Sequence, residues 1–158
     1  AAGVDADVAI AGLERAQPAA MRGEIAAIGG RQVIVDCYNA NPASMAAAID
    51  TLADLRGSAG AVAVVGDMLE LGDHAAAAHA DVGARLGALG IPVVALGAHR
   101  QLVADATGAP AAAWTTDDPM VAARQVLAVT APGDWVLIKA SRGMRLERVL
   151  AALRELTA

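Results

Sequence analysis

Short runs of apolar residues alternate along this chain with longer stretches in which apolar residues recur every three or four positions. The short runs are rich in valine and alanine, as is typical of strands buried on both faces of a parallel sheet. The longer stretches predict helices with one apolar face. We therefore expect six strands, at Glu24–Ile28, Gln32–Cys37, Ala61–Val65, Pro92–Leu96, Ala112–Trp114 and Trp135–Ile138.

Helices are expected between these strands, and several carry recognisable start signals such as a proline at the first helical position. They cover Val8–Ala16, Pro42–Arg56, Ala75–Leu89, His99–Ala106, Pro119–Val129 and Arg142–Leu156. Repeated strand–helix units with short connections favour an α/β fold. We predict a Rossmann-like, six-stranded, mainly parallel sheet with helices on both faces, in which Glu24–Ile28 is an edge strand closed by the Gly29-Gly30 turn.

Pro18 and Gly23 interrupt the pattern after the first helix. We interpret residues 1–23 as the tail of an upstream domain followed by a linker, and residues 24–158 as one domain. A length of 158 residues suits a single domain with a sizeable core.

Composition excludes several classes of protein. A net charge of −5 without a basic stripe argues against nucleic-acid binding. No apolar run approaches the roughly 18 residues of a membrane helix, and the charged residues within Ala1–Ala20 exclude a signal peptide. We therefore expect a cytoplasmic protein without membrane insertion.

The side chains that most often bind metals give no recognisable pattern. Cys37 is the only cysteine and has apolar or neutral neighbours, so we expect a structural thiol. His74, His79 and His99 lack the spacing of a metal-ligand motif, and we predict no metal site.

Polar side chains gather where the strand that contains Val33–Val35 meets the next helix. Asn41 is a good N-cap and Pro42 suits the first helical position, which explains these two residues structurally. The same reasons do not explain Tyr38 and Asn39. Together with Asp36 they lie at the carboxyl end of a strand, where open α/β sheets bind ligands. The amide groups of Asn39 and Asn41 can both donate and accept hydrogen bonds, and Tyr38 offers a flat face to such a ligand.

A second cluster follows the strand at Trp135–Ile138. Lys139 is the only lysine of the chain, Ser141 is a plausible N-cap, and Arg142 and Arg145 fall in the first turn expected for the last helix. Cations there oppose the helix dipole, so the cluster suits a carboxylate or phosphate. The alternative is a solvated helix start with arginines that bind nothing.

Three blocks of the sequence resemble one family in the expected order. Asp36-Cys37-Tyr38-Asn39-Ala40-Asn41-Pro42 resembles the D-[SC]-Y-N-A-N-P motif of the bacterial UDP-N-acetylmuramoyl-tripeptide–D-alanyl-D-alanine ligases, the MurF type of Mur ligase. Val65-Gly66-Asp67-Met68-Leu69-Glu70-Leu71-Gly72, followed by His79, is similar to the family's V-G-D-M-x-E-L-G…H segment. Ile138-Lys139-Ala140-Ser141-Arg142-Gly143-Met144 is similar to its V-K-G-S-R-x-M block, although Ala140 replaces the family's glycine.

The resemblance implies that residues 24–158 are the C-terminal domain of an ATP-dependent amide ligase of peptidoglycan synthesis. Such an enzyme adds D-Ala-D-Ala to UDP-MurNAc-tripeptide, and this domain closes over ATP and the acceptor dipeptide. The implied nucleotide contacts are Asp36, Tyr38, Asn39, Asn41 and Asp67. The implied acceptor contacts are Lys139, Ser141 and Arg142. Glu70 and His79 match family positions too, and we expect structural roles or contacts to the partner domain.

The chain lacks the parts that such a ligase needs for its chemistry. It contains no phosphate-binding loop of the G-x-x-G-K-[ST] type. We therefore expect ATP and Mg²⁺ to be bound mainly by a central ATPase domain on which this one packs, and the isolated chain to be inactive. The alternatives are the same domain of a related Mur ligase or folylpolyglutamate synthase, or a stand-alone module that binds a nucleotide or a protein.

Overall fold

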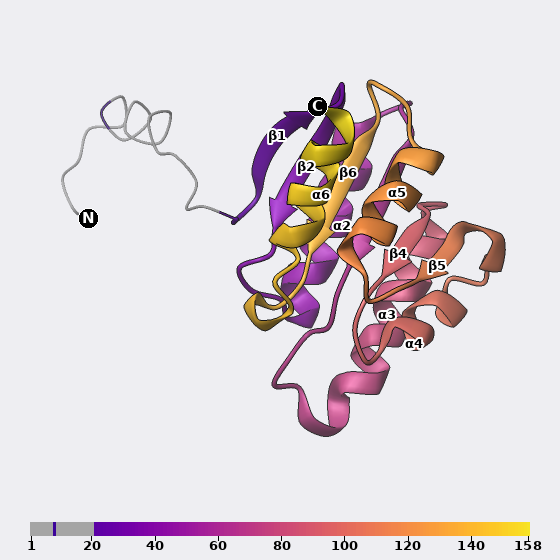
Figure 1. The fold of residues 1–158 in the computed structure, drawn as a ribbon. Helices are drawn as coiled ribbons and strands as arrows, with labels where there is room; N and C mark the ends of the chain where they lie inside the picture. The colour runs from indigo at the N-terminus through magenta and orange to yellow at the C-terminus, as the bar shows by residue number, and fades with distance from the viewer. Residues whose placement is uncertain (1–7, 9–20) are drawn as a thin grey trace.

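The computed structural model describes Val8 and residues 21–158, and it contains the predicted six-stranded sheet (Figure 1). The strand order is β1-β2-β6-β3-β4-β5. Only β1 runs antiparallel, and it lies at one edge. The strands are β1 (Glu24–Ile28), β2 (Arg31–Asp36), β3 (Ala61–Val65), β4 (Val93–Ala95), β5 (Ala113–Thr115) and β6 (Trp135–Lys139).

Helices cover both faces of the sheet, as the sequence predicted. One core layer lies between the sheet and α5 with α6, and the other lies between the sheet and α2, α3 and α4. Figure 1 shows α6, in yellow, lying along one face of the strands. The helices are α2 (Pro42–Arg56), α3 (Ala75–Ala88), α4 (Arg100–Ala106), α5 (Pro119–Val129) and α6 (Glu147–Thr157), with short 3₁₀ turns at Gly72–His74, Pro110–Ala112 and Arg142–Met144.

The last helix begins later than predicted. Residues Arg142–Met144 form a 3₁₀ turn, and Arg145 then adopts a left-handed conformation with φ 52°, so α6 starts only at Glu147. Ser141 makes no side-chain capping bond. The prediction that Arg142 and Arg145 lie in the first turn of that helix was therefore wrong. The predicted helix at Val8–Ala16 lies outside the described residues except for Val8, and the boundary at residue 23 stays a prediction.

Two glycines allow α3 and α4 to pack closely. A Cβ atom at Gly83 would overlap the carbonyl oxygen of Val103, and one at Gly87 would overlap that of Thr107. The backbone of α4 therefore lies directly against α3.

Among the helices that the structure describes, none is both long enough and apolar enough to cross a membrane.

We predict that Gly83→Ala destabilises the domain by roughly 3 kcal/mol, because the new methyl group overpacks a backbone contact. Elsewhere in a helix the same change is stabilising, since alanine has the higher helix propensity. Chemical denaturation measures the effect, with Ala84→Ser on the exposed side of α3 as the control. A Gly83→Ala variant as stable as the parent chain would show that α4 does not touch α3 in this way.

Candidate functional site

Three strands end side by side at the carboxyl edge of the sheet. In the parallel register Asp36 of β2 is paired with Lys139 of β6, and Lys139 is paired with Val65 of β3. The loops that follow these strands carry all three sequence motifs. The fold therefore brings the motifs to one edge, as expected for a ligand site of an open α/β sheet.

A buried ion pair joins the first two of these strands. The side chain of Lys139 is 1% exposed, and its Nζ donates to Asp36 Oδ2 at 2.5 Å and to the carbonyl oxygen of Asn39 at 3.0 Å. Asp36 is 23% exposed. Because the only lysine of the chain is engaged in this way, the direct role of Lys139 is to hold the turn after β2.

Ser141 joins all three loops. Its backbone N–H donates to the carbonyl oxygen of Asp67 at 3.1 Å. Its Oγ accepts from the backbone N–H of Leu69 at 2.9 Å and donates to the carbonyl oxygen of Ala40 at 3.4 Å. The buried hydroxyl is thus occupied by protein groups on both sides, and Ser141 fixes the loops relative to one another.

A pocket of about 460 Å³ opens beside this arrangement, between α2 and strands β1 and β2. It brings together five of the eight predicted site residues: Asp36, Tyr38, Asn39, Asn41 and Lys139. The predicted residues Asp67, Ser141 and Arg142 do not line it. Its floor is apolar, with side chains that include Ile25, Ile34, Ala47, Ala48 and Leu55.

The two asparagines of the pocket have their amide oxygens engaged. Asn39 Oδ1 accepts from the N–H of Ala40 at 2.9 Å. Asn41 Oδ1 accepts from the N–H of Ser44 at 2.8 Å in a capping box that starts α2. Their side-chain NH₂ groups make no hydrogen bond within the described part of the chain. The pocket therefore offers donors, which suit an acceptor-rich or anionic ligand.

Arg22 is a site residue that sequence reasoning missed. Its guanidinium lies 4.1 Å from the ring centroid of Tyr38, which is 43% exposed, and it lines the same pocket. The backbone N–H of Tyr38 donates to the carbonyl oxygen of Met21 at 3.3 Å. Arg22 precedes β1 and was assigned to the linker, and no local sequence signal places it beside Tyr38.

Asp67 lies outside the lining of the pocket. Its carboxylate is buried and accepts from the backbone N–H groups of Ala98, at 2.8 Å, and His99, at 3.1 Å. It therefore holds the start of α4, on the far side of β3 from the pocket. Gly97, with φ 103°, lies against this carboxylate and leaves no room for a Cβ atom. The protein thus engages both carboxylate oxygens of Asp67, and the nucleotide contact stays a prediction.

Arg142 is the exposed cation of the third motif. Its side chain is 52% exposed, and Nη1 donates to Glu147 Oε1 at 2.9 Å. It also lies 3.5 Å from Met21 Sδ. The predicted cluster of Lys139, Ser141 and Arg142 is therefore divided: two members are buried and hold the loops, and Arg142 alone faces solvent.

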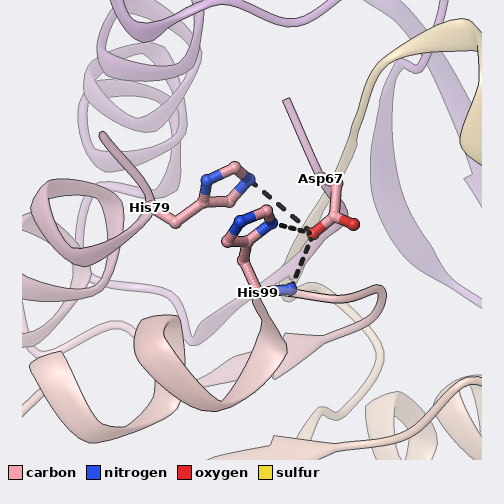
Figure 2. A group of neighbouring side chains, drawn as sticks. All are labelled: Asp67, His79 and His99. Carbon is pink, nitrogen blue, oxygen red and sulfur yellow. Dashed lines mark hydrogen bonds and ion pairs between the residues drawn. The ribbon is translucent and has the colours of Figure 1, made fainter. Parts of the chain in front are cut away.

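Three side chains that commonly bind metals meet behind the pocket. Asp67, His79 and His99 have ligand atoms that all lie within 4.8 Å of one another (Figure 2), a grouping that histidine spacing did not reveal. The two imidazole rings are stacked, 4.2 Å apart and 12° from parallel. A bound metal lies near the plane of each imidazole that binds it. These two rings are stacked and nearly parallel, so their planes meet only far from the ring nitrogens. The arrangement therefore does not fit a metal site.

Two other motif residues have structural roles. Burial, and then the charge of Glu147, raises the pKa of Cys37 to about 11, so it stays a thiol, as the sequence indicated. Ala140, which replaces the family's glycine, has no positive φ. Its methyl group packs against Gly66, where a Cβ atom on residue 66 would be too close. The alanine therefore costs no backbone strain.

We predict that Lys139→Met lowers the free energy of unfolding by about 3 kcal/mol, because it leaves Asp36 without its counter-ion. Methionine has a similar length, so lost packing contributes little. In the double variant Asp36→Leu, Lys139→Met, both charges are gone and part of the stability should return. Urea denaturation measures all three proteins. A loss below about 1 kcal/mol for Lys139→Met would contradict the account.

His79 should make stability depend on pH. Burial lowers the pKa of His79 below that of an ordinary histidine, about 6.5. Above that value the ring is neutral in both states; below it, the unfolded chain binds a proton that the folded chain does not. The free energy of unfolding should therefore fall as the pH drops from about 6.5 toward the folded pKa.

Urea denaturation between about pH 7.5 and about pH 5.5 measures this slope. The slope should be shallower in His79→Gln, which does not titrate, and unchanged in the control His74→Gln, whose histidine is exposed. Equal slopes in all three proteins would be evidence against a neutral, buried His79.

Comparison with known proteins finds the family that the three sequence motifs resemble. Residues 21–142 match the model of the family described as Mur ligase, glutamate ligase domain. The UDP-N-acetylmuramoyl-tripeptide–D-alanyl-D-alanine ligase of Bacillus subtilis (strain 168) is 34% identical over 165 residues, covering 97% of this chain and 35% of that protein. The chain thus spans about a third of the length of this curated relative.

Solved structures give the same result. A crystal structure of MurF from Acinetobacter baumannii is similar with a TM-score of 0.82 and 31% identity, over 97% of this chain and 34% of that one. The MurF ligase of Thermotoga maritima, solved in complex with ADP, has a TM-score of 0.77 and 28% identity, over 90% of this chain and 32% of that one. By sequence and by fold, this chain belongs to the family of Mur ligase, glutamate ligase domains.

Proposed function

We propose that this chain is the C-terminal domain of an ATP-dependent ligase that adds D-Ala-D-Ala to UDP-MurNAc-tripeptide in peptidoglycan synthesis. The observation that carries the proposal is the pocket, which brings together Tyr38, Asn39 and Asn41 of the family motif. The side-chain NH₂ groups of the two asparagines bond to no residue that the structure describes. The name of the curated relative, which matches nearly the whole chain, supports the substrate. The ADP complex of a similar structure supports the nucleotide.

In the proposed reaction, ATP and then D-Ala-D-Ala react with the carboxylate of the tripeptide. ATP transfers its terminal phosphoryl group to the carboxylate of the tripeptide, and ADP leaves. The amine of D-Ala-D-Ala then attacks the acyl carbon and expels phosphate, forming the amide bond. The chain contains no phosphate-binding loop of the G-x-x-G-K-[ST] type, so phosphate and Mg²⁺ binding fall to a central ATPase domain on which this one packs.

The pocket supplies the nucleotide contacts in this proposal. The NH₂ groups of Asn39 and Asn41 donate to acceptor atoms of adenine or ribose, and the ring of Tyr38 stacks on a flat face. Arg22 adds a positive charge at the same opening. Asp36 acts through Lys139, since their ion pair fixes the turn that carries the other groups.

Arg142 is the proposed contact for the acceptor. Its guanidinium can donate to both oxygens of the terminal carboxylate of D-Ala-D-Ala. This contact requires that the ion pair between Arg142 and Glu147 break. Lys139 and Ser141 hold the loop that carries it and stay within the protein. Because ATP and nucleotide-linked sugar precursors are made inside the cell, the enzyme should act in the cytoplasm.

The acceptor substrate distinguishes this proposal from the other assignments. A related Mur ligase or a folylpolyglutamate synthase would use another acceptor, and a stand-alone module would have no ATPase partner. The protein that carries this domain is assayed for ADP release with UDP-MurNAc-tripeptide and D-Ala-D-Ala, with D-glutamate, or with a folate and L-glutamate. ADP release that depends on the first pair supports the proposal, and release with another pair overturns it.

Two substitutions should separate the nucleotide contact from the acceptor contact. Asn41→Ser keeps the cap of α2 but loses the amide donor, so the Michaelis constant for ATP should rise roughly 2- to 12-fold, as expected for one hydrogen bond. Arg142→Lys keeps the charge but loses the two-pronged grip, so the Michaelis constant for D-Ala-D-Ala should rise instead.

Each variant serves as the control for the other, because both should leave the melting temperature nearly unchanged. If Asn41→Ser left the ATP constant unaltered, Asn41 would only be a helix cap. If Arg142→Lys changed both constants equally, Arg142 would only shape the loop.

A further inference from the structure

His79 lies away from the pocket, yet hydrogen bonds connect it to Ser141. Its Nδ1 lies 2.6 Å from the carbonyl oxygen of Ala75, and its Nε2 accepts from the backbone N–H of Met68 at 2.9 Å. The neighbouring N–H, of Leu69, donates to Ser141 Oγ. The carbonyl oxygen of Asp67, on the other side of Met68, accepts from the N–H of Ser141.

These partners fix the proton on the ring. A carbonyl oxygen only accepts, so Nδ1 must carry the hydrogen; a backbone N–H only donates, so Nε2 must be bare. His79 therefore holds Met68 only while the imidazole is neutral. Burial also lowers the pKa of His79, which agrees with a neutral ring.

A protonated ring would have another partner close by. Asp67 Oδ1 lies 3.7 Å from Nε2, and His99 is stacked on the ring with its Nδ1 3.3 Å from the same oxygen (Figure 2). Asp67 and His99 are the titratable groups that face His79. A proton on Nε2 would turn it from an acceptor for Met68 into a donor toward Asp67.

We propose that neutral His79 is a positioning residue for the acceptor side of the site, and that its protonation releases the Asp67–Leu69 loop from Ser141. This inference rests on the proposed function for its link to D-Ala-D-Ala. Ser141 directly precedes Arg142, so loosening the loop misplaces the guanidinium that takes the acceptor carboxylate. The turn at Asn39 and Asn41 is held by Lys139 at Asn39 and by Ser141 Oγ at Ala40, and neither of these bonds involves Met68 or His79.

The kinetic test uses the protein that carries this domain, from about pH 7.5 to as far below the ordinary histidine pKa of about 6.5 as the folded protein tolerates, because burial lowers the pKa of His79. The Michaelis constant for D-Ala-D-Ala should rise about 3- to 10-fold toward the acid end, as for one lost hydrogen bond, while that for ATP stays nearly constant. His79→Gln keeps an acceptor near Met68 but does not titrate, so it should remove this rise. His79→Leu should raise the constant at every pH.

The control His74→Gln changes an exposed histidine at the start of α3 and should keep the parent profile. The proposal is overturned if His79→Gln has the same pH profile as the parent, or if ATP and acceptor constants change together. Should His79→Leu fail to fold, His79→Gln alone decides between these outcomes.

A second measurement is independent of the enzyme's substrate. In nuclear magnetic resonance spectra of the 158-residue chain, the backbone amide signals of Met68, Leu69 and Ser141 should shift together as the His79 ring titrates, and should not do so in His79→Gln. If these amide signals do not shift as the His79 ring titrates, the inference is overturned. A protein that shows this coupling but lacks D-Ala-D-Ala ligase activity would instead refute the proposed function.

Discussion

The site depends on one buried ion pair between two parallel strands. Lys139 ends β6 and Asp36 ends β2, and the register places them opposite each other at the edge where the loops begin. A buried pair of this kind often adds little net stability, because both charges lose their hydration. Here its effect is positional. The same ammonium also binds the carbonyl oxygen of Asn39, so the turn that carries the pocket's donors cannot move independently of the sheet.

Most of the fold could be predicted from the hydrophobic pattern. The runs at β3 and β6 are apolar because both faces of these strands are buried, and α2 begins at Pro42 because Asn41 caps it. The last helix was misplaced because its start depends on tertiary contacts. The hydroxyl of Ser141, which looked like a helix cap, is bound to Leu69 and Ala40 instead, and the left-handed residue at Arg145 delays the helix.

The site itself was predictable only in part. Motif positions showed which residues meet at the sheet edge, and the pocket contains most of them. The sequence did not reveal which polar groups remain available after the protein has made its own hydrogen bonds. Lys139 and Asp67 are both charged and both follow buried strands, yet each is engaged by the protein. Arg22 lies outside the motifs and was missed, because only the pairing of the antiparallel edge strand with β2 brings it beside Tyr38.

The central claim is that a nucleotide binds the side-chain NH₂ groups of Asn39 and Asn41, which bond to no described residue. It does not bind the charged groups of Lys139 and Asp67, which hold the loops. The most direct test is a titration of the isotope-labelled chain with ADP, followed by nuclear magnetic resonance. The account predicts that the side-chain NH₂ signals of Asn39 and Asn41 and the backbone signal of Tyr38 shift, while those of Gly97–His99 beside Asp67 do not. Shifts centred on Gly97–His99, or none at Asn39 and Asn41, would contradict it.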